Sequence, residues 1–325
     1  MTVSAEAVTW AYRFFLGREP ESEAAVAAHR DAKNELQLAR RMMRSPEFAA
    51  RRHDFAMLPV GELVEPDALE VDCDGTPAEI AACLAKIKSA WSHLGMARPH
   101  FSVLTDSRFL PDNLPRSLDD FWGSGEVAAA QLLRTLARHG FTPAGKNCVE
   151  YGCGVGRVTN SLARSFARVD AYDISAAHLE IARQHAREQA VHNVHFHECA
   201  ANILADLEPC DVYYSRIVLQ HNPPPVITQL ICKAFAALRP GGIAAFQVPT
   251  YMAGYRFRLR QWLADDHPLE MQMHCLPQAK IFEIAAEQHC MVLEVREDGS
   301  AGARDRIASN TFVVRKASAV APGGG

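Results

Sequence analysis

Short apolar runs alternate with amphipathic segments from about residue 147 to residue 316. Such runs are typical of buried strands, and the segments between them show the period of helices. This alternation predicts a parallel sheet covered by helices on both faces. The last two runs are joined by a polar, glycine-containing stretch, which predicts a final antiparallel hairpin. The predicted strands are 148–151, 168–172, 194–198, 212–215, 243–248, 291–295 and 311–315, and the predicted helices lie near 156–166, 176–190, 223–238 and 277–289.

The first 145 residues show helical patterns instead. Residues 1–55 place Val8, Tyr12 and Leu16 at helical spacing before Gly17, and we expect a small all-helical domain there. Residues 56–75 contain prolines and glycines and indicate a linker with one short strand near 68–71.

Residues 76–145 are interpreted as a helical lid and lead-in to a core at 146–316. One helix begins with a capping box at Thr76 and Glu79, and Gly95 is expected to end it. A second helix is expected over residues 126–139. The stretch 317–325 is expected to be a disordered tail.

Composition narrows the class of protein. A chain of 325 residues with 48% hydrophobic and 22% charged residues is typical of a soluble globular protein. Its net charge of −4 argues against a nucleic-acid partner, and no apolar run reaches the roughly 18 residues of a membrane span. The nine cysteines form no C-x-x-C pair, and the first six residues lack the pattern of a signal peptide, so we expect a cytoplasmic protein.

The strongest candidate for a binding site is the run C-V-E-Y-G-C-G-V-G-R-V-T at 148–159. Its glycines, Gly152, Gly154 and Gly156, follow a predicted strand, where a ligand can approach the backbone closely. Glu150 would repel a pyrophosphate but attract an ammonium group. Asp173, at the tip of the second predicted strand, can accept both hydroxyls of an unphosphorylated ribose. Because nucleotide-binding dehydrogenases share such a loop, a nucleotide-binding or non-catalytic Rossmann-like domain is the alternative interpretation.

These motifs, with R-I-V-L-Q-H-N-P-P-P and L-R-P-G-G-I-A-A-F-Q-V further on, resemble the class I S-adenosylmethionine-dependent methyltransferase family over about 225 residues. The resemblance implies an α/β, Rossmann-like, doubly wound sheet of seven strands with the last one antiparallel. It implies S-adenosylmethionine as cofactor, with its methionine part over residues 152–156 and its ribose on Asp173. Residues implied beside the adenine or the amino-acid end are Ile174, Ala200, Ala201, Asn202 and Ser215. Many relatives carry Asp at the position of Ala200, so backbone groups of Ala201 or Asn202 are expected to replace it.

Three segments upstream, 91–95, 102–106 and 121–126, resemble the lid of a subset of these enzymes. Their aromatic residues Trp91 and Phe121 are expected to exclude water from the cofactor. Ordinary helix packing is the alternative interpretation for both.

His221 is the candidate general base, and Arg216 a candidate contact for the acceptor. His221 follows the fourth predicted strand, where a parallel sheet presents ligands, and its ordinary pKa suits proton transfer near neutral pH. Related quinone-precursor methyltransferases carry E-x-x-E-H here and bind a metal. This chain has R-I-V-L-Q-H at 216–221, from Arg216 through Gln220 to His221, and both acids are absent, so we expect no metal. A structural turn is the alternative for His221, and the arginines at 256, 258 and 260 are an alternative acceptor site.

The sequence therefore predicts a methyltransferase that acts on an oxygen of a sugar, a glycan or another hydroxylated small molecule. One alternative is a small-molecule N-methyltransferase, and another is a cofactor-binding regulatory or scaffold protein. The run A-Y-R-F-F-L-G-R-E-P, closed by S-P-E-F, resembles a small bacterial helical module found on glycan-associated proteins. It implies protein docking through residues 1–55; a helical extension covering the main domain is the alternative.

Overall fold

The computed structural model describes residues 3–50, 68–201, 204, 206–266, 271–302 and 306–318. The chain divides into two compact units, Met1–Glu65 and Pro66–Gly325. The boundaries predicted from the sequence stay predictions, because most of the expected linker and tail lie outside the described residues. Among the described helices, none is both long and apolar enough to cross a membrane.

The first unit is helical in its described part, as predicted. Ser4 caps its first helix through a bond from the Ala7 N–H to the serine hydroxyl. Gly17, in the left-handed region at a φ of 60°, ends the second helix. The apolar positions at helical spacing, among them Val8 and Leu16, pack into a small core of their own. The elements are α1 (Ala5–Ala11), η1 (Tyr12–Leu16), α2 (Glu23–Ala27), α3 (Glu35–Met43) and α4 (Pro46–Ala50).

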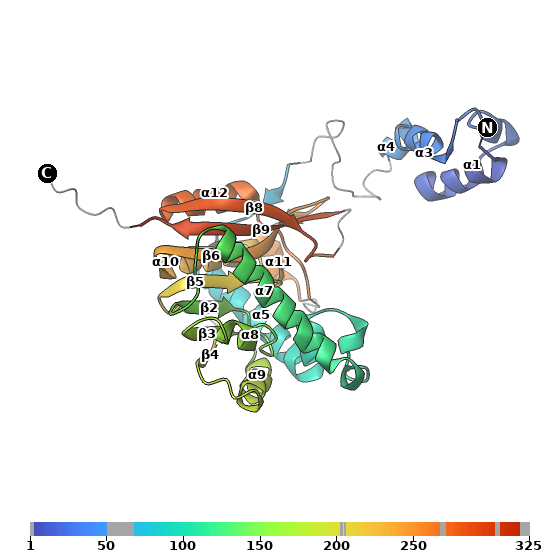
Figure 1. Ribbon diagram of the computed structural model, residues 1–325. Coiled ribbons are helices and arrows are strands. Elements are labelled where there is room, and N and C mark those ends of the chain that lie inside the picture. The colour runs from blue at the N-terminus through green and yellow to red at the C-terminus, as the bar shows by residue number, and fades with distance from the viewer. Residues whose placement is uncertain are drawn as a thin grey trace. The chain divides into compact units, whose positions relative to one another are not determined.

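The second unit is built on a seven-stranded sheet in the order β4-β3-β2-β5-β6-β9-β8 (Figure 1). The first five strands in this order run parallel to one another. The final strand, β9, is antiparallel to both of its neighbours, which confirms the predicted reversed last strand. The strands are β2 (Asn147–Tyr151), β3 (Arg168–Asp173), β4 (Val194–Glu198), β5 (Cys210–Ser215), β6 (Leu238–Met252), β8 (Cys290–Asp298) and β9 (Ile307–Lys316).

Helices cover both faces of this sheet (Figure 1). One face packs α7 (Leu118–Arg138) and α8 (Thr159–Ala163) against alternate residues of β2, β5 and β6, and α9 (Ala176–Glu188) packs against β3. The other face carries α5 (Pro77–Ala97), α10 (Pro224–Ala237) and α12 (Gln278–Glu287). Strands buried on both faces explain why their sequences read as continuous apolar runs.

Two helices of the lead-in are longer than predicted, because glycine serves close packing in both. The prediction that Gly95 ends α5 is wrong: the helix continues to Ala97. A Cβ on Gly95 would lie 2.3 Å from the Ser175 hydroxyl oxygen. Helix α7 begins at Leu118 and not at 126, and a Cβ on Gly125 would lie 1.8 Å from the Arg157 carbonyl oxygen. The missing side chains let both helices approach the core closely.

A small parallel sheet pairs β1 (Glu70–Val71) with β7 (Arg256–Phe257). β1 is the short strand that was expected near 68–71. The arginines proposed as an alternative acceptor site lie beside it and pair with acids. Arg258 bonds Glu70 and Asp72, and Arg256 also approaches Glu70. These pairs favour a structural role for that segment, which continues into α11 (Leu259–Ala264). The other short helices are α6 (Pro99–Val103), η3 (Ser107–Phe109), η4 (Leu114–Arg116) and η5 (Leu219–His221).

Candidate functional site

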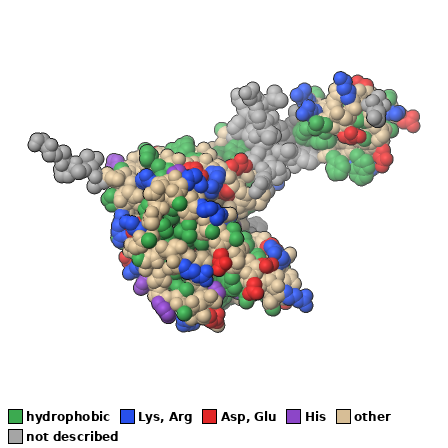
Figure 2. Space-filling model, viewed as in Figure 1, with side chains coloured by type: hydrophobic (Ala, Val, Ile, Leu, Met, Phe, Trp, Pro, Cys, Tyr) green, Lys and Arg blue, Asp and Glu red, His purple; other side chains and the backbone are tan. Residues whose placement is uncertain are grey.

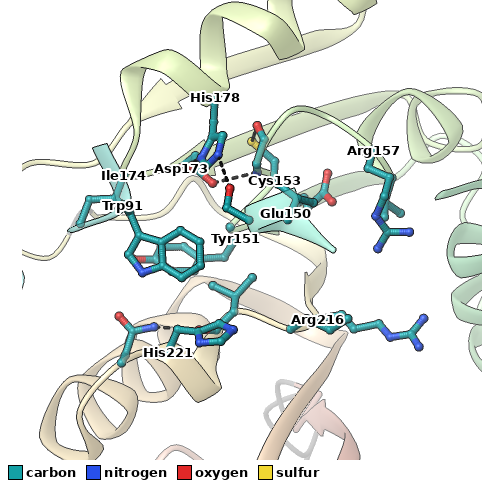
Figure 3. A pocket seen from close by; sticks show the side chains of 18 of the residues that line it. Trp91, Glu150, Tyr151, Cys153, Arg157, Asp173, Ile174, His178, Arg216 and His221 are labelled. Carbon is teal, nitrogen blue, oxygen red and sulfur yellow. Dashed lines mark hydrogen bonds and ion pairs between the residues drawn. The ribbon is translucent and has the colours of Figure 1, made fainter. Parts of the chain in front are cut away.

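A cavity opens at the carboxyl ends of β2, β3 and β5, under α5 and α6 (Figure 3). Trp91 and Ile174 lie at one side of it, and Arg157 and Arg216 lie at the opposite side. The cavity therefore has an apolar end and a cationic end. Eight of the residues singled out from the sequence line it: Trp91, Glu150, Gly152, Gly154, Asp173, Ile174, Arg216 and His221.

The glycine loop forms the floor of the cavity. Gly152, Gly154 and Gly156 have φ values of 78°, 55° and 82°, which other residues rarely adopt. A Cβ on Gly152 would lie 2.3 Å from the Val218 side chain, and one on Gly154 would lie 2.5 Å from Val103. Both glycines are thus required by their backbone conformation and by the side chains packed on them. Gly156 faces α9 and does not line the cavity.

Asp173 connects the glycine loop to the start of α9. Its Oδ2 accepts from the Gly154 N–H at 2.8 Å, and its Oδ1 accepts from the Ser175 N–H at 2.9 Å. His178 Nδ1 lies 3.7 Å from Oδ1, while its Nε2 lies 2.9 Å from the Ser102 hydroxyl on α6. A carboxylate has about four lone-pair positions. Those that remain can accept hydroxyl groups from the cavity, so the proposed ribose contact is compatible with this network.

Glu150 is buried at the end of β2. Its Oε2 accepts a bond of 2.6 Å from the Thr159 hydroxyl of α8. Burial raises the pKa of this carboxyl group to about 7, because a charged oxygen loses its hydration there. A cation that enters the cavity would stabilise the ionised form. The carboxyl group of Glu150 is thus suited to bind an ammonium group in its ionised form.

Arg157 is a cavity residue that the sequence interpretation missed. Its guanidinium donates to the Ser124 hydroxyl at 3.1 Å, while its buried Nε finds no partner among the described residues. Burial lowers its pKa, although an arginine remains charged at neutral pH. A buried cation with an unused donor is a ready partner for an anionic group. The position of Arg157 directly after G-x-G-x-G could have indicated that it lines the cavity.

His221 lies in η5, at the start of the loop that leads to α10. Its Nδ1 donates to the Gln272 carbonyl at 3.1 Å, which leaves Nε2 unprotonated. The Gln220 side-chain amide lies 3.2 Å from Nε2 and donates to it. Burial lowers the pKa of His221, so the ring is neutral at pH 7. Trp91 packs edge-on against this ring, with centroids 5.2 Å apart.

The backbone that carries Arg216 and Val218 is strained. Ile217 has a φ of 60°, which is costly for a β-branched residue. Its N–H donates to the side-chain Oε1 of Gln247 at 2.9 Å, and Nε2 of Gln247 donates to Oε1 of Gln220 at 3.0 Å. One buried side chain on β6 therefore fixes both the strained turn and the glutamine that contacts His221.

The remaining predicted residues that the structure describes lie outside this cavity. Ser215 is fully buried, and its hydroxyl donates to the Tyr151 carbonyl at 2.9 Å. Ala200 and Ala201 follow β4 without lining the cavity, and Asn202 lies outside the described residues. Phe121 packs with Phe109 in the lid, so ordinary helix packing describes it. Besides Arg157, the interpretation missed the cavity residue His178, whose place within a helical pattern gave no signal of a site. Ser102 and Val103 belong to the segment 102–106 expected in the lid, and Val218 belongs to the R-I-V-L-Q-H run.

Comparison with known proteins gives a family for this segment. Residues 148–242 match the methyltransferase domain family. The chain is 41% identical over 102 residues to the ubiquinone biosynthesis O-methyltransferase of Cupriavidus pinatubonensis, covering 30% of this chain and 39% of that protein. For the same enzyme of Ralstonia nicotianae the identity is 37% over 105 residues, covering 32% and 43%. The chain thus spans about two fifths of the length of these curated relatives.

Among solved structures, the magnesium protoporphyrin IX methyltransferase of Synechocystis PCC 6803 with bound SAH is similar to this chain. The two are 19% identical with a TM-score of 0.45, over 62% of this chain and 87% of that one. The matched family segment contains the glycine loop, Asp173 and the turn that carries Arg216 and His221. Through this segment, the chain contains a methyltransferase domain, and these similarities support an S-adenosylmethionine-dependent methyltransferase.

Proposed function

We propose that this protein transfers the methyl group of S-adenosylmethionine to an oxygen of a hydroxylated small molecule or glycan, with His221 as general base and without a metal. The observation that carries the proposal is the arrangement of His221. A neutral ring with its unprotonated Nε2 held in place lies on the same cavity as the glycine loop.

The cavity fits the cofactor by the chemistry of its walls. The amino acid part carries a carboxylate and an ammonium group, and Arg157 and Glu150 offer the complementary charges at the cationic end. The orphaned Nε of Arg157 gains the acceptor that it lacks. At the other end, Asp173 offers lone pairs to the ribose, and Ile174 and Trp91 offer apolar surface to the adenine. When bound, the cofactor supplies a methyl group on a positively charged sulfur.

His221 then acts on the acceptor. An acceptor hydroxyl that replaces the Gln220 amide at Nε2 gives its proton to that nitrogen as the oxygen becomes methylated. Because Gln272 holds the Nδ1 proton, the imidazolium that forms is oriented and stabilised by this carbonyl. Trp91 excludes water from the same side of the ring. Arg216 lies across the cavity, as a contact for the acceptor.

We propose that a metal takes no part because of the residue types beside His221. Arg216 bonds Gln131 and Ser300, and Gln220 bonds Gln247, so neither supplies an anionic ligand. A divalent cation bound through the motif E-x-x-E-H would require acids at Ile217 and Gln220, and neither residue carries a carboxylate.

The test is calorimetry with S-adenosylmethionine, followed by methyl-transfer assays with matched hydroxyl and amine acceptors in excess chelator. We expect binding, transfer to hydroxyl acceptors and full activity under chelation. Asp173→Ala should weaken cofactor binding by about 1–3 kcal/mol, the scale of lost charge-assisted hydrogen bonds. Transfer to amines alone would identify an N-methyltransferase. Binding without transfer to any acceptor would identify a regulatory or scaffold protein, and activity lost to chelator and restored by magnesium would reject the metal-free mechanism.

For the first unit we propose docking to another protein. Trp10 and Phe14 stack on its surface with ring centroids 5.5 Å apart, and their side chains are 46% and 66% exposed. An exposed aromatic pair is typical of binding surfaces. A photo-reactive phenylalanine analogue at position 14 should crosslink to one protein in cells, whereas the analogue at the exposed position of Lys33 should not. Equal crosslinking at both positions would contradict docking.

A further inference from the structure

A second cavity lies beside the first, on the face of the sheet that α7 covers. It is bounded by α7, by the carboxyl ends of β5 and β6, and by the turn that follows β8. It encloses about 1030 Å³ of space, open solvent at its mouth included, which is ample for a small metabolite. Tyr214 and Arg216 line both cavities, so the two share a wall.

The walls of this second cavity carry an excess of positive charge. Four arginines line it, Arg134, Arg138, Arg216 and Arg296, against the single acid Asp298. Figure 2 shows Lys and Arg side chains gathered near β8 and β9 on this face. The arginines come from α7, from the turn after β5 and from β8, so segments far apart in the sequence converge on one space.

The acids nearby leave this charge uncompensated. Glu294 pairs with Arg138 at 2.7 Å and with Arg296 at 3.5 Å, one carboxylate for two guanidinium groups. Asp298 already accepts from the Ser300 N–H and from the hydroxyls of Ser309 and Thr311. It is therefore held within the β8–β9 hairpin.

Arg216 and Arg134 have no acidic partner among the residues that the structure describes. Among the described residues, Arg216 bonds neutral groups, the side-chain Oε1 of Gln131 at 3.1 Å and the Ser300 hydroxyl at 3.4 Å. Arg134 is exposed on α7. Guanidinium groups held by neutral partners retain their full charge and their preference for a two-oxygen anion.

We propose that this arginine cavity binds an oxyanion group, a phosphate monoester or a carboxylate, of the methyl acceptor. The proposal rests on the proposed function, because it extends the acceptor from a hydroxylated molecule to an anionic one. Arg216 connects the two spaces: the anionic group lies among the arginines, and the hydroxyl reaches past Arg216 toward His221. The cavity thus selects the acceptor by charge, and His221 selects the reacting oxygen.

The first test measures binding of inorganic phosphate and of acetate to the full chain saturated with S-adenosylhomocysteine, which occupies Arg157. We expect saturable binding that weakens as potassium chloride is raised. Arg134→Gln should weaken it by about ten-fold, and Arg134→Glu more strongly, since each removes a charged donor. Arg134 forms no ion pair with the residues that the structure describes, so both variants should melt like the parent chain. Arg183→Gln on α9, far from this cavity in the fold, is the matched control and should leave binding unchanged.

The outcomes separate this proposal from the proposed function. Tighter binding of phosphate identifies a phosphate monoester, and tighter binding of acetate identifies a carboxylate. Absence of saturable binding for both anions, or equal binding by the Arg134 variants, would overturn the arginine cavity even if the chain binds its cofactor. If the chain does not bind S-adenosylhomocysteine, the proposed function fails. The anion titration is then made on the free chain, where loss of binding in the Arg134 variants still supports the cavity.

A kinetic readout distinguishes recognition from a structural effect. With hydroxylated acceptors compared with and without a phosphate group, Arg134→Gln should raise the KM of the phosphorylated acceptor alone. Its kcat should be unchanged, because Arg134 lies away from the reacting oxygen. An equal change in KM for both acceptors would contradict recognition of the anion.

Discussion

Glu150 and His221 border the same cavity, and burial shifts their pKa values in opposite directions. The carboxyl group is neutral when protonated and the imidazole is neutral when deprotonated, and loss of hydration favours the neutral form of each. The pKa of Glu150 rises to about 7, while that of His221 falls. Both groups are thereby prepared for their proposed partners: an ammonium group for the first and a hydroxyl proton for the second.

Replacement of His221 tests whether this ring accepts the hydroxyl proton of the acceptor. His221→Ala should lower turnover by about 10²–10⁴-fold, the usual contribution of a general base. Cofactor affinity should change little. Since only the neutral ring accepts a proton, the parent rate should rise with pH through the pKa of His221. Burial lowers that pKa, so the rise should be complete before neutral pH. The variant should lack this inflection, and an unaltered rate and pH profile would make His221 structural.

Replacement of Glu150 tests whether this carboxylate binds the ammonium group of the cofactor. Below its pKa of about 7, Glu150 is protonated in the free protein and must lose its proton when it binds an ammonium group. Affinity for S-adenosylhomocysteine should therefore fall as the pH is lowered from 7.5 to 6, by at most about ten-fold per pH unit. Glu150→Gln should bind more weakly and without this slope. Glu126→Gln, at an exposed ion pair with Arg164, is the control. A slope that persists in Glu150→Gln would assign the proton to another group.

At the scale of elements, α5 and α7 are positioned by glycines within the helices. Gly95 lets α5 approach the start of α9, and Gly125 lets α7 approach the backbone of the glycine loop. Each position costs helix propensity, about 1 kcal/mol relative to alanine. The contacts offset this cost because they hold the lid helices against the cavity.

Two glycines of α7 allow a matched test of whether close packing requires glycine within this helix. Gly125→Ala should lower the free energy of unfolding by about 1–3 kcal/mol, because the new methyl group overlaps a backbone carbonyl that cannot move freely. Gly123→Ala, two residues earlier, meets nothing within 4 Å and should raise it by up to about 1 kcal/mol. Denaturant titration of both variants is the measurement. Equal effects would show that helix propensity alone decides both positions.

At the scale of the whole molecule, each of the two units has a core of its own. The helical unit buries Val8, Leu16 and Met42 among its own helices, and the cavities described above are lined entirely by residues beyond position 80. We therefore expect cofactor recognition to depend on the second unit alone.

A chain that starts at residue 66 tests this independence. It should fold cooperatively and bind S-adenosylhomocysteine with the affinity of the full chain, because no described residue of the first unit lines the cavity. Calorimetry on both chains is the measurement. A truncated chain that unfolds cooperatively yet has lost the cofactor would contradict the independence of the two units.

Most of the fold was predictable because its signals are local. The runs near 148–151 and 212–215 became β2 and β5, since a strand buried on both faces is mostly apolar. Thr76 and Glu79 formed the expected capping box. The helix limits at Gly95 and 126 were wrong for a physical reason: glycine ends a helix when its backbone turns left-handed, but within a helix it allows close packing. The identity of the residue does not distinguish the two cases.

The sequence by itself determined the glycine loop, the acids at the ends of β2 and β3, and the histidine after β5, because a parallel sheet presents such residues at one edge. Only the tertiary structure decided how they act. It left a donor of Arg157 without a partner, set the protonated nitrogen of His221 through Gln272, and brought Arg134, Arg216 and Arg296 to one cavity. These properties depend on desolvation and on contacts between distant segments. The pattern of apolar residues along the chain predicts which face of an element is buried. Only the tertiary structure determines which residues that face contacts.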